Sequence, residues 1–128
     1  MTLFFDRNLG KSIPEALKLL GLEVEKHDDH FPANATDEEW LEHVGNKGWP
    51  VVTADARLRL NQSQLRALAD YRVGCFMLCG AGNRPRWYAV RIIARNWEHI
   101  EIVANSGQRP FLHRLYLKQP PRCTEVGL

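Results

Sequence analysis

The sequence lacks any apolar run of membrane-spanning length, and it contains only three cysteines. Its longest apolar stretch, Val73 to Ala81, is short and includes glycines, which is typical of a buried strand. The cysteines have no zinc-ligand spacing, so we expect reduced thiols in a cytoplasmic protein. These absences argue against a membrane protein, a zinc finger and a disulfide-stapled scaffold.

Two common catalytic motifs are also missing. No serine has the glycine pattern of a nucleophile elbow, which argues against a serine hydrolase. Gly80 and Gly82 resemble half of a phosphate loop, but the Lys and Ser or Thr that complete such a loop do not follow, so we expect a plain turn. The segment from His27 to His30 could suggest a metal loop, but we interpret it as a flexible, solvated loop.

Neither sign of charge dominates the chain, but the charges are unevenly distributed. The net charge of the 128 residues is +2. Residues 1–47 hold ten acids and five bases (−5), residues 48–83 two acids and four bases (+2), and residues 84–128 three acids and eight bases (+5). This asymmetry suggests a polyanionic partner that meets metal-neutralised carboxylates. The alternative is an ordinary solvated surface with chance clustering.

Expected strands and helices alternate along the chain. Apolar spacing at i, i+3 and i+4 predicts helices, and short apolar or alternating runs predict strands. The expected helices cover residues 13–20, 36–47, 62–71 and 86–95, and the expected strands cover residues 3–5, 22–26, 51–53, 73–79, 100–103 and 111–117. In this interpretation a turn at Ser106 and Gly107 joins the last two strands.

This alternation predicts an α/β fold with a mostly parallel sheet and helices on both faces. We expect a single domain over residues 1–119 and a flexible C-terminal tail over residues 120–128.

Two aspartates follow buried strands in the same way. Asp6 ends the first strand, and Asp55 comes two residues after Thr53. Ligands of an open parallel sheet bind beyond the carboxyl ends of its strands, so the two carboxylates would share one cleft if the strands are neighbours. Crowded carboxylates repel one another unless a hard cation binds them. Each aspartate alone would be interpreted as a turn residue, but the pair favours a functional site.

A third acid is expected from the helix over residues 36–47. Residues 36–39 match a capping box, in which Glu39 reaches back to Thr36. Asp37 lies close to the buried direction of this helix, whereas Glu38 lies a quarter-turn away and is the reserve candidate. Acids in a first turn also favour the helix dipole, which is the alternative explanation.

Residues 5–8 (FDRN), 36–40 (TDEEW) and 51–55 (VVTAD) together resemble the PIN-domain superfamily, and the chain looks most similar to small proteins of the VapC toxin type. The resemblance covers nearly the whole chain in the order and spacing of its elements. It implies a three-layer α/β/α fold and an endoribonuclease that depends on Mg²⁺ or Mn²⁺. It further implies an RNA substrate, a cognate antitoxin protein and a homodimer.

By position, Asp6, Asp37 and Asp55 match the acidic metal ligands of this superfamily. Thr53 and Asn8 match supporting polar residues beside them. The arginines nearest to these acids are candidate ligands of the substrate phosphate, because guanidinium matches phosphate geometry. These arginines are Arg7, Arg57 and Arg59.

One residue departs from the superfamily pattern. Many PIN proteins carry another acid two residues after the position of Asp55, where this chain has Arg57. Fewer carboxylates would bind metal more weakly, so a module that binds RNA or protein without cutting it is the main alternative. A flavodoxin-like domain for a phosphorylated ligand is a third interpretation, but it would need a phosphate-cradling loop.

Aromatic residues near the basic helix offer a second type of contact to nucleic acid. Trp87 and Trp97 flank the helix that carries Arg86, Arg91 and Arg95. Exposed tryptophans can stack on bases, although packing within a core or a protein interface is the more common role.

Overall fold

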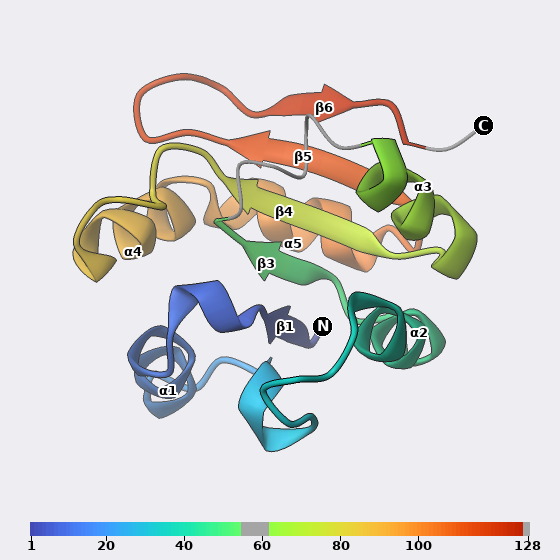
Figure 1. Cartoon of the computed structure of the whole chain (residues 1–128). Helices are drawn as coiled ribbons and strands as arrows, with labels where there is room; N and C mark the ends of the chain where they lie inside the picture. Colours follow the sequence, from blue (N-terminus) through green and yellow to red (C-terminus); the bar gives the residue numbers. More distant parts are fainter. Residues whose placement is uncertain (55–61, 127–128) are drawn as a thin grey trace.

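A six-stranded sheet forms the middle of the molecule, with strand order β2-β1-β3-β4-β5-β6 (Figure 1). The structure, a computed structural model, describes residues 1–54 and 62–126. The first five strands are parallel, and β6 pairs antiparallel with β5. The strands are β1 (Leu3–Phe5), β2 (Val24–Lys26), β3 (Val51–Thr53), β4 (Gly74–Leu78), β5 (Phe111–Leu115) and β6 (Arg122–Thr124).

Helices cover both faces of the sheet. They are α1 (Ser12–Leu19), α2 (Asp37–Lys47), α3 (Gln62–Tyr71), α4 (Arg86–Arg95) and α5 (Trp97–Asn105), with two short 3₁₀ turns, η1 (Arg7–Leu9) and η2 (His27–Asp29). This arrangement confirms the expected α/β fold of three layers. No helix in the described residues is long and apolar enough to cross a membrane.

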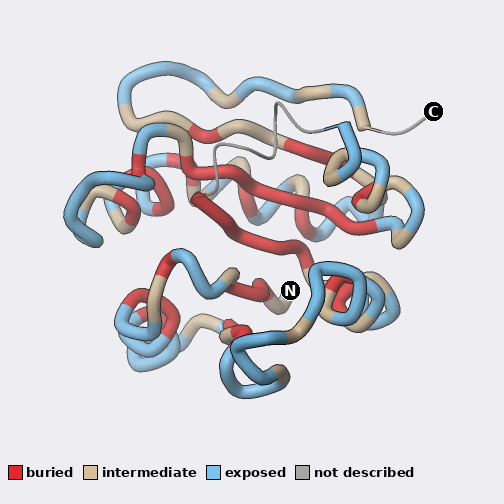
Figure 2. Tube along the Cα trace, viewed as in Figure 1, coloured by how far each residue is buried: buried red, intermediate tan, exposed pale blue. Residues whose placement is uncertain are grey.

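The alternation of side chains along each strand divides the core into two halves. Phe4, Val51 and Cys75 point to one face, where they pack with α2 and α3. Phe5, Val52 and Phe76 point to the other face, where they pack with α1, α4 and α5. Because both faces are covered, the central strands are buried along their length, as Figure 2 shows. This explains why these strands are continuously apolar rather than alternating.

Residues 100–103 are helical, and the expectation of a strand there is wrong. They belong to α5, where Ile100 and Ala104 are buried one turn apart. The side chain of Asn96 closes the joint between α4 and α5 by donating hydrogen bonds to the carbonyls of Ile92 (2.8 Å) and Tyr116 (3.0 Å). The β-branched residues of this segment favour strands, but their helical spacing on a buried face prevails.

Two further differences concern the end of the chain. Ser106 and Gly107 do not join two strands but follow the end of α5, and β5 pairs in parallel with β4. Within the expected tail of residues 120–128, the structure places Arg122–Thr124 in the sheet as β6. A short segment at a sheet edge gains a ladder of backbone hydrogen bonds, which local sequence composition does not reveal.

Gly74 provides a test of the packing between β4 and β5. A Cβ atom at this position would lie 2.1 Å from the Phe111 ring. We therefore expect Gly74→Ala to lower the free energy of unfolding by about 1–3 kcal/mol, as overpacking of a rigid core usually does. At Gly82 the nearest atom, Ala54 O, would lie 3.6 Å away, so Gly82→Ala is the control. Equal urea midpoints for the two variants would contradict this packing.

Candidate functional site

The strand order changes direction between β1 and β3. β2 lies on one side of β1, whereas β3, β4 and β5 follow on the other side. At such a switch point the connections leave in opposite directions and open a crevice at the carboxyl ends of the strands. Asp6 directly follows β1 and Thr53 is the last residue of the neighbouring β3, so the fold brings both to this crevice.

A chain of hydrogen bonds joins the ends of β1 and β3. The Thr53 hydroxyl donates to Asp6 Oδ2 (2.9 Å), and Asn8 Nδ2 donates to Thr53 Oγ1 (3.2 Å). The backbone N–H of Ala54 donates to Asn8 Oδ1 (3.3 Å). Asn8 and Thr53 thus hold the Asp6 carboxylate in place, and Asn8 also holds the backbone just before residue 55.

The environment of Asp6 opposes its negative charge. Burial raises the pKa of this carboxyl above the ordinary 3.8, and the nearby Asp37 adds to the increase. The hydrogen bond from Thr53, the backbone N–H of Arg7 and the charge of His27 lower the pKa and partly offset burial. A carboxylate in such a position gains stability from a cation, because an opposite charge favours the ionised form.

Asp37 lines the same pocket as Asp6. The pocket has a volume of about 540 Å³ and is lined by Asp6, Asp37, Asn8 and Thr53, among others. Asp37 is the first residue of α2, and the expected capping box is confirmed, with Thr36 and Glu39 exchanging two hydrogen bonds of 3.2 Å. The cap fixes the start of α2 and therefore the position of Asp37.

Glu38, the reserve candidate, faces another depression. It lies with Ser63, Arg66 and Asp70 between α2 and α3, outside the pocket of Asp6. Asp37 lines both depressions, so the structure brings it together with Asp6 in one and with Glu38 in the other, and Glu38 does not line the pocket of Asp6. Asp55, Arg57 and Arg59 lie outside the described residues, so their predicted roles stay predictions.

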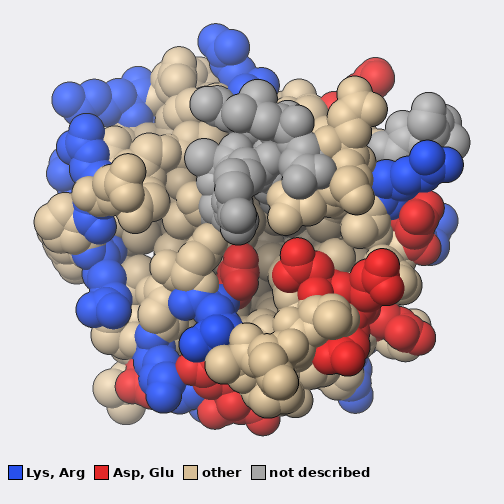
Figure 3. All heavy atoms as spheres, viewed as in Figure 1, with Lys and Arg blue, Asp and Glu red and all other residues tan. Residues whose placement is uncertain are grey.

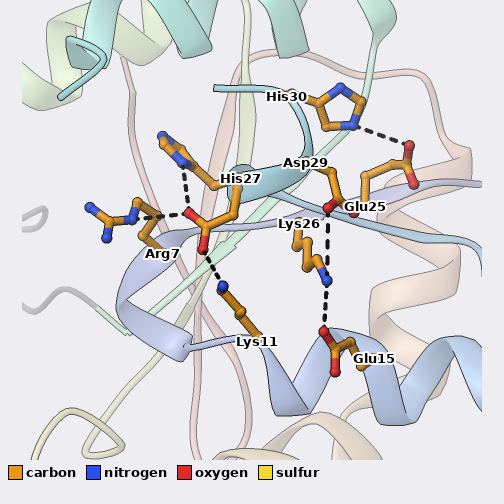
Figure 4. A network of polar contacts seen from close by, with 9 residues as sticks. Arg7, Lys11, Glu15, Glu25, Lys26, His27, Asp29 and His30 are labelled. Atoms are coloured by element: carbon orange, nitrogen blue, oxygen red, sulfur yellow. Dashed lines mark hydrogen bonds and ion pairs between the residues drawn. The ribbon is translucent and has the colours of Figure 1, made fainter. Parts of the chain in front are cut away.

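Arg7 reaches the pocket wall but is engaged on its other side. Its Nε lies 3.1 Å from Asp28 Oδ1, and its Nη1 donates to the Ala33 carbonyl (3.3 Å). Figure 4 shows the wider network, in which Lys26 bridges Glu15 and Asp29. Solvent reaches the Arg7–Asp28 pair and weakens it, so Arg7 is able to exchange Asp28 for another anion.

The segment from His27 to His30 differs from the solvated loop that we expected. His27 is only 3% exposed and lies in the 3₁₀ turn η2. Its ring packs against Phe4, Phe31 and Trp40 at centroid distances of 5.6 to 6.2 Å. Although its neighbours in the sequence are polar, His27 is buried and packs between Phe4 of β1 and Trp40 of α2.

Some pocket residues were missed in the sequence. Trp40 packs against the core, but its half-buried ring also lines the pocket, and its Nε1 donates to Asp37 Oδ1 (3.1 Å). Cys75 lines the floor from β4, and burial raises the pKa of its thiol well above the usual range. The helical spacing of Asp37 and Trp40, three residues apart, was the available signal for their contact.

The surface around this pocket is polarised. In Figure 3, Asp and Glu side chains gather over α2, whereas Lys and Arg side chains line the opposite side over α4. The separation of charge along the sequence therefore becomes a separation in space. An acidic site beside a basic surface can hold a cation and a polyanion next to each other.

The donor atoms of the pocket fit a hard divalent cation. Asp6 and Asp37 supply carboxylate oxygens, and within residues 1–54 and 62–126 neither forms an ion pair with Lys, Arg or His. Oxygen ligands with room for several waters suit Mg²⁺ and Mn²⁺. The part of the chain that the structure describes contains no group of three His, Cys, Asp or Glu side chains able to hold a metal. A complete site therefore needs water, substrate or residue 55.

The raised pKa of Asp6 predicts a specific pH dependence of stability. Between the ordinary value of 3.8 and the higher folded-state pKa, the folded protein binds more protons than the unfolded chain. Without metal, stability should therefore fall as the pH rises from about 4 through the folded-state pKa. Asp6→Asn cannot titrate and should lack this loss. Urea unfolding in EDTA over this range, with the exposed Asp70→Asn as a charge control, measures the difference. Parallel curves for wild type and Asp6→Asn would contradict the prediction.

Comparison with known proteins identifies one family. A family model described as a PIN-like domain matches residues 1–80, which is more than half of the chain and includes β1, β3 and the start of α2. No curated protein and no solved structure matches the chain.

Proposed function

Because the chain belongs to the PIN-like domain family, we propose that it is an endoribonuclease that uses a divalent metal to hydrolyse RNA phosphodiester bonds. The observation that carries this proposal is the Asp6 carboxylate, which is held by Thr53 at the switch point and lines one pocket together with Asp37. A partly buried carboxylate whose pKa is raised by desolvation lowers the stability of the fold, and such groups cluster at functional sites.

Asp6, Asp37 and Asp55 would hold Mg²⁺ or Mn²⁺ in this proposal. When bound, such a metal lowers the pKa of a coordinated water and stabilises negative charge on the phosphate. The Thr53 hydroxyl already orients one oxygen of the Asp6 carboxylate before any metal binds. Asn8 accepts a hydrogen bond from the backbone N–H of Ala54. Because Asp55 is the next residue in the sequence, this bond near the metal ligands favours the proposal that Asp55 is one of them.

The arginines would hold the RNA backbone. Arg7 lines the pocket and can give up its exposed pair with Asp28. Arg57 and Arg59 follow Asp55 in the sequence and are proposed for the same role. Guanidinium groups bind phosphate oxygens in a bidentate manner, which would orient the phosphodiester bond above the carboxylates.

We propose further that the protein is the toxin of a toxin–antitoxin pair in the cytoplasm, where it forms a homodimer and is restrained by its antitoxin. This part rests on the resemblance of the three acidic motifs to VapC-type proteins. A free nuclease would be hazardous to its host, so a restraining partner accounts for how the cell tolerates it.

A module that binds RNA without cutting it is the second candidate. The specific feature that favours it is Arg57, which stands where many PIN proteins have another acid. A positive charge in place of a carboxylate weakens cation binding, and the phosphate contacts would remain.

A cleavage assay distinguishes these two functions. We expect the wild-type protein to cut labelled RNA in Mn²⁺ or Mg²⁺ and to lose this activity in EDTA. Asp6→Asn should abolish cleavage, because it removes a metal ligand. Asn8→Ala should lower activity about 10- to 100-fold through the loss of positioning.

Asp70→Asn is the matched control, since it removes one carboxylate from α3 outside the pocket and should retain full activity. Each variant is checked for folding by its thermal unfolding. Cleavage that persists in Asp6→Asn would contradict the proposed site. RNA binding without cleavage by the wild type would favour the second candidate.

A further inference from the structure

The outer face of α4 combines an exposed aromatic ring with positive charge. Ala89, Ile92 and Ile93 bury the inner face of this helix. Trp87 lies on the opposite side with 68% of its surface exposed, and Arg91 follows one helical turn later on the same side. A large aromatic residue at this exposure lacks the packing that usually explains a tryptophan.

The segment of sequence around Trp87 contains no acidic residue. Residues 71–97 contain five arginines and no Asp, Glu or Lys. Arg84 lies over the Tyr88 ring, with its guanidinium carbon 4.6 Å from the ring centre. Arg95 donates to the Gln119 carbonyl (3.1 Å) and ties α4 to the loop after β5. This surface is therefore basic, and the C-terminal end of α4 is attached to the loop after β5.

The surface begins next to the candidate site. α4 starts after the carboxyl end of β4, at the same edge of the sheet as Asp6. The Arg86 guanidinium lies against Gly10, where a Cβ would approach its Nη2 to 2.9 Å. A second pocket of about 370 Å³ is lined by Ala54, which follows Thr53 of the candidate site, and by Gly82 and Arg84, which precede α4.

We propose that α4 is a binding surface for single-stranded RNA, in which Trp87 stacks on an unpaired base and Arg84 and Arg91 contact the flanking phosphates. The strand leaves the pocket of Asp6, crosses Ala54 and Arg84, and reaches the outer face of α4. This inference rests on the proposed function and adds to it a preference for unpaired RNA.

The positive charge of this surface favours single-stranded RNA over a protein as its ligand. A ring flanked by guanidinium groups, without nearby acids from its own segment, complements a polyanion that also carries π faces. Stacking requires bases that are free of a duplex, because the bases of a duplex are already stacked on each other. The family match ends at residue 80, so α4 is a feature of this chain beyond the matched region.

RNA binding without cleavage tests this inference directly. A labelled single strand of about 12 nucleotides and its duplex are titrated with protein in EDTA, and the anisotropy is measured. Trp87→Ala should weaken single-strand binding about 5- to 100-fold, and Trp87→Phe should restore most of the affinity. Leu19→Ala, another highly exposed apolar side chain at the far end of α1, should change nothing.

Arg91→Gln adds an independent readout. If Arg91 contacts one phosphate, the slope of log affinity against log salt should become shallower by about 0.7. A purely structural role would leave this slope unchanged. The wild type should also bind the single strand more tightly than the duplex.

The outcomes separate this inference from the proposed nuclease activity. Single-strand binding that depends on Trp87, in a protein that cuts no RNA, would support the surface and overturn the nuclease. Cleavage by the wild type with equal RNA affinity in Trp87→Ala would keep the nuclease and overturn the surface. Absence of any RNA binding, or a Trp87 effect confined to a protein partner, would overturn the surface as well.

Discussion

The hydrogen bond between Thr53 and Asp6 is the interaction on which the site depends. It joins the ends of two neighbouring parallel strands at the point where the sheet reverses its strand order. Burial raises the pKa of Asp6, and the Thr53 hydroxyl offsets only part of this effect. The Asp6 carboxylate thus stays in a position, near Asp37, where its negative charge is unfavourable and an apolar residue would stabilise the fold more. A bound divalent cation would relieve both the burial and the repulsion.

Much of this arrangement could be predicted because it depends on local rules. The apolar runs at residues 3–5 and 51–53 are buried strands, and the capping box at Thr36 and Glu39 starts α2. A residue that follows a buried parallel strand lies at the carboxyl edge of the sheet, which places Asp6 without any structure. The α/β layers follow from the same alternation of elements.

Other features could not be predicted because they depend on contacts between distant segments. Residues 100–103 have strand-like composition, but they bury Ile100 against the sheet as part of α5. β6 forms only because β5 offers an open edge. The burial of His27 depends on Phe4 and Trp40, which lie far from it in the sequence. The hydrogen bond from Trp40 to Asp37 makes a residue that packs against the core part of the pocket lining as well.

A titration with Mn²⁺ tests most directly whether the carboxylates at the switch point form a metal site. Calorimetry on the wild type, Asp6→Asn, Asp37→Asn and the control Asp70→Asn would measure the affinity of each protein. The account predicts that wild type and Asp70→Asn bind Mn²⁺ alike and that Asp6→Asn and Asp37→Asn bind it at least about tenfold more weakly. Equal Mn²⁺ affinity in wild type and Asp6→Asn would contradict it, because the Asp6 carboxylate would then have no part in holding the cation.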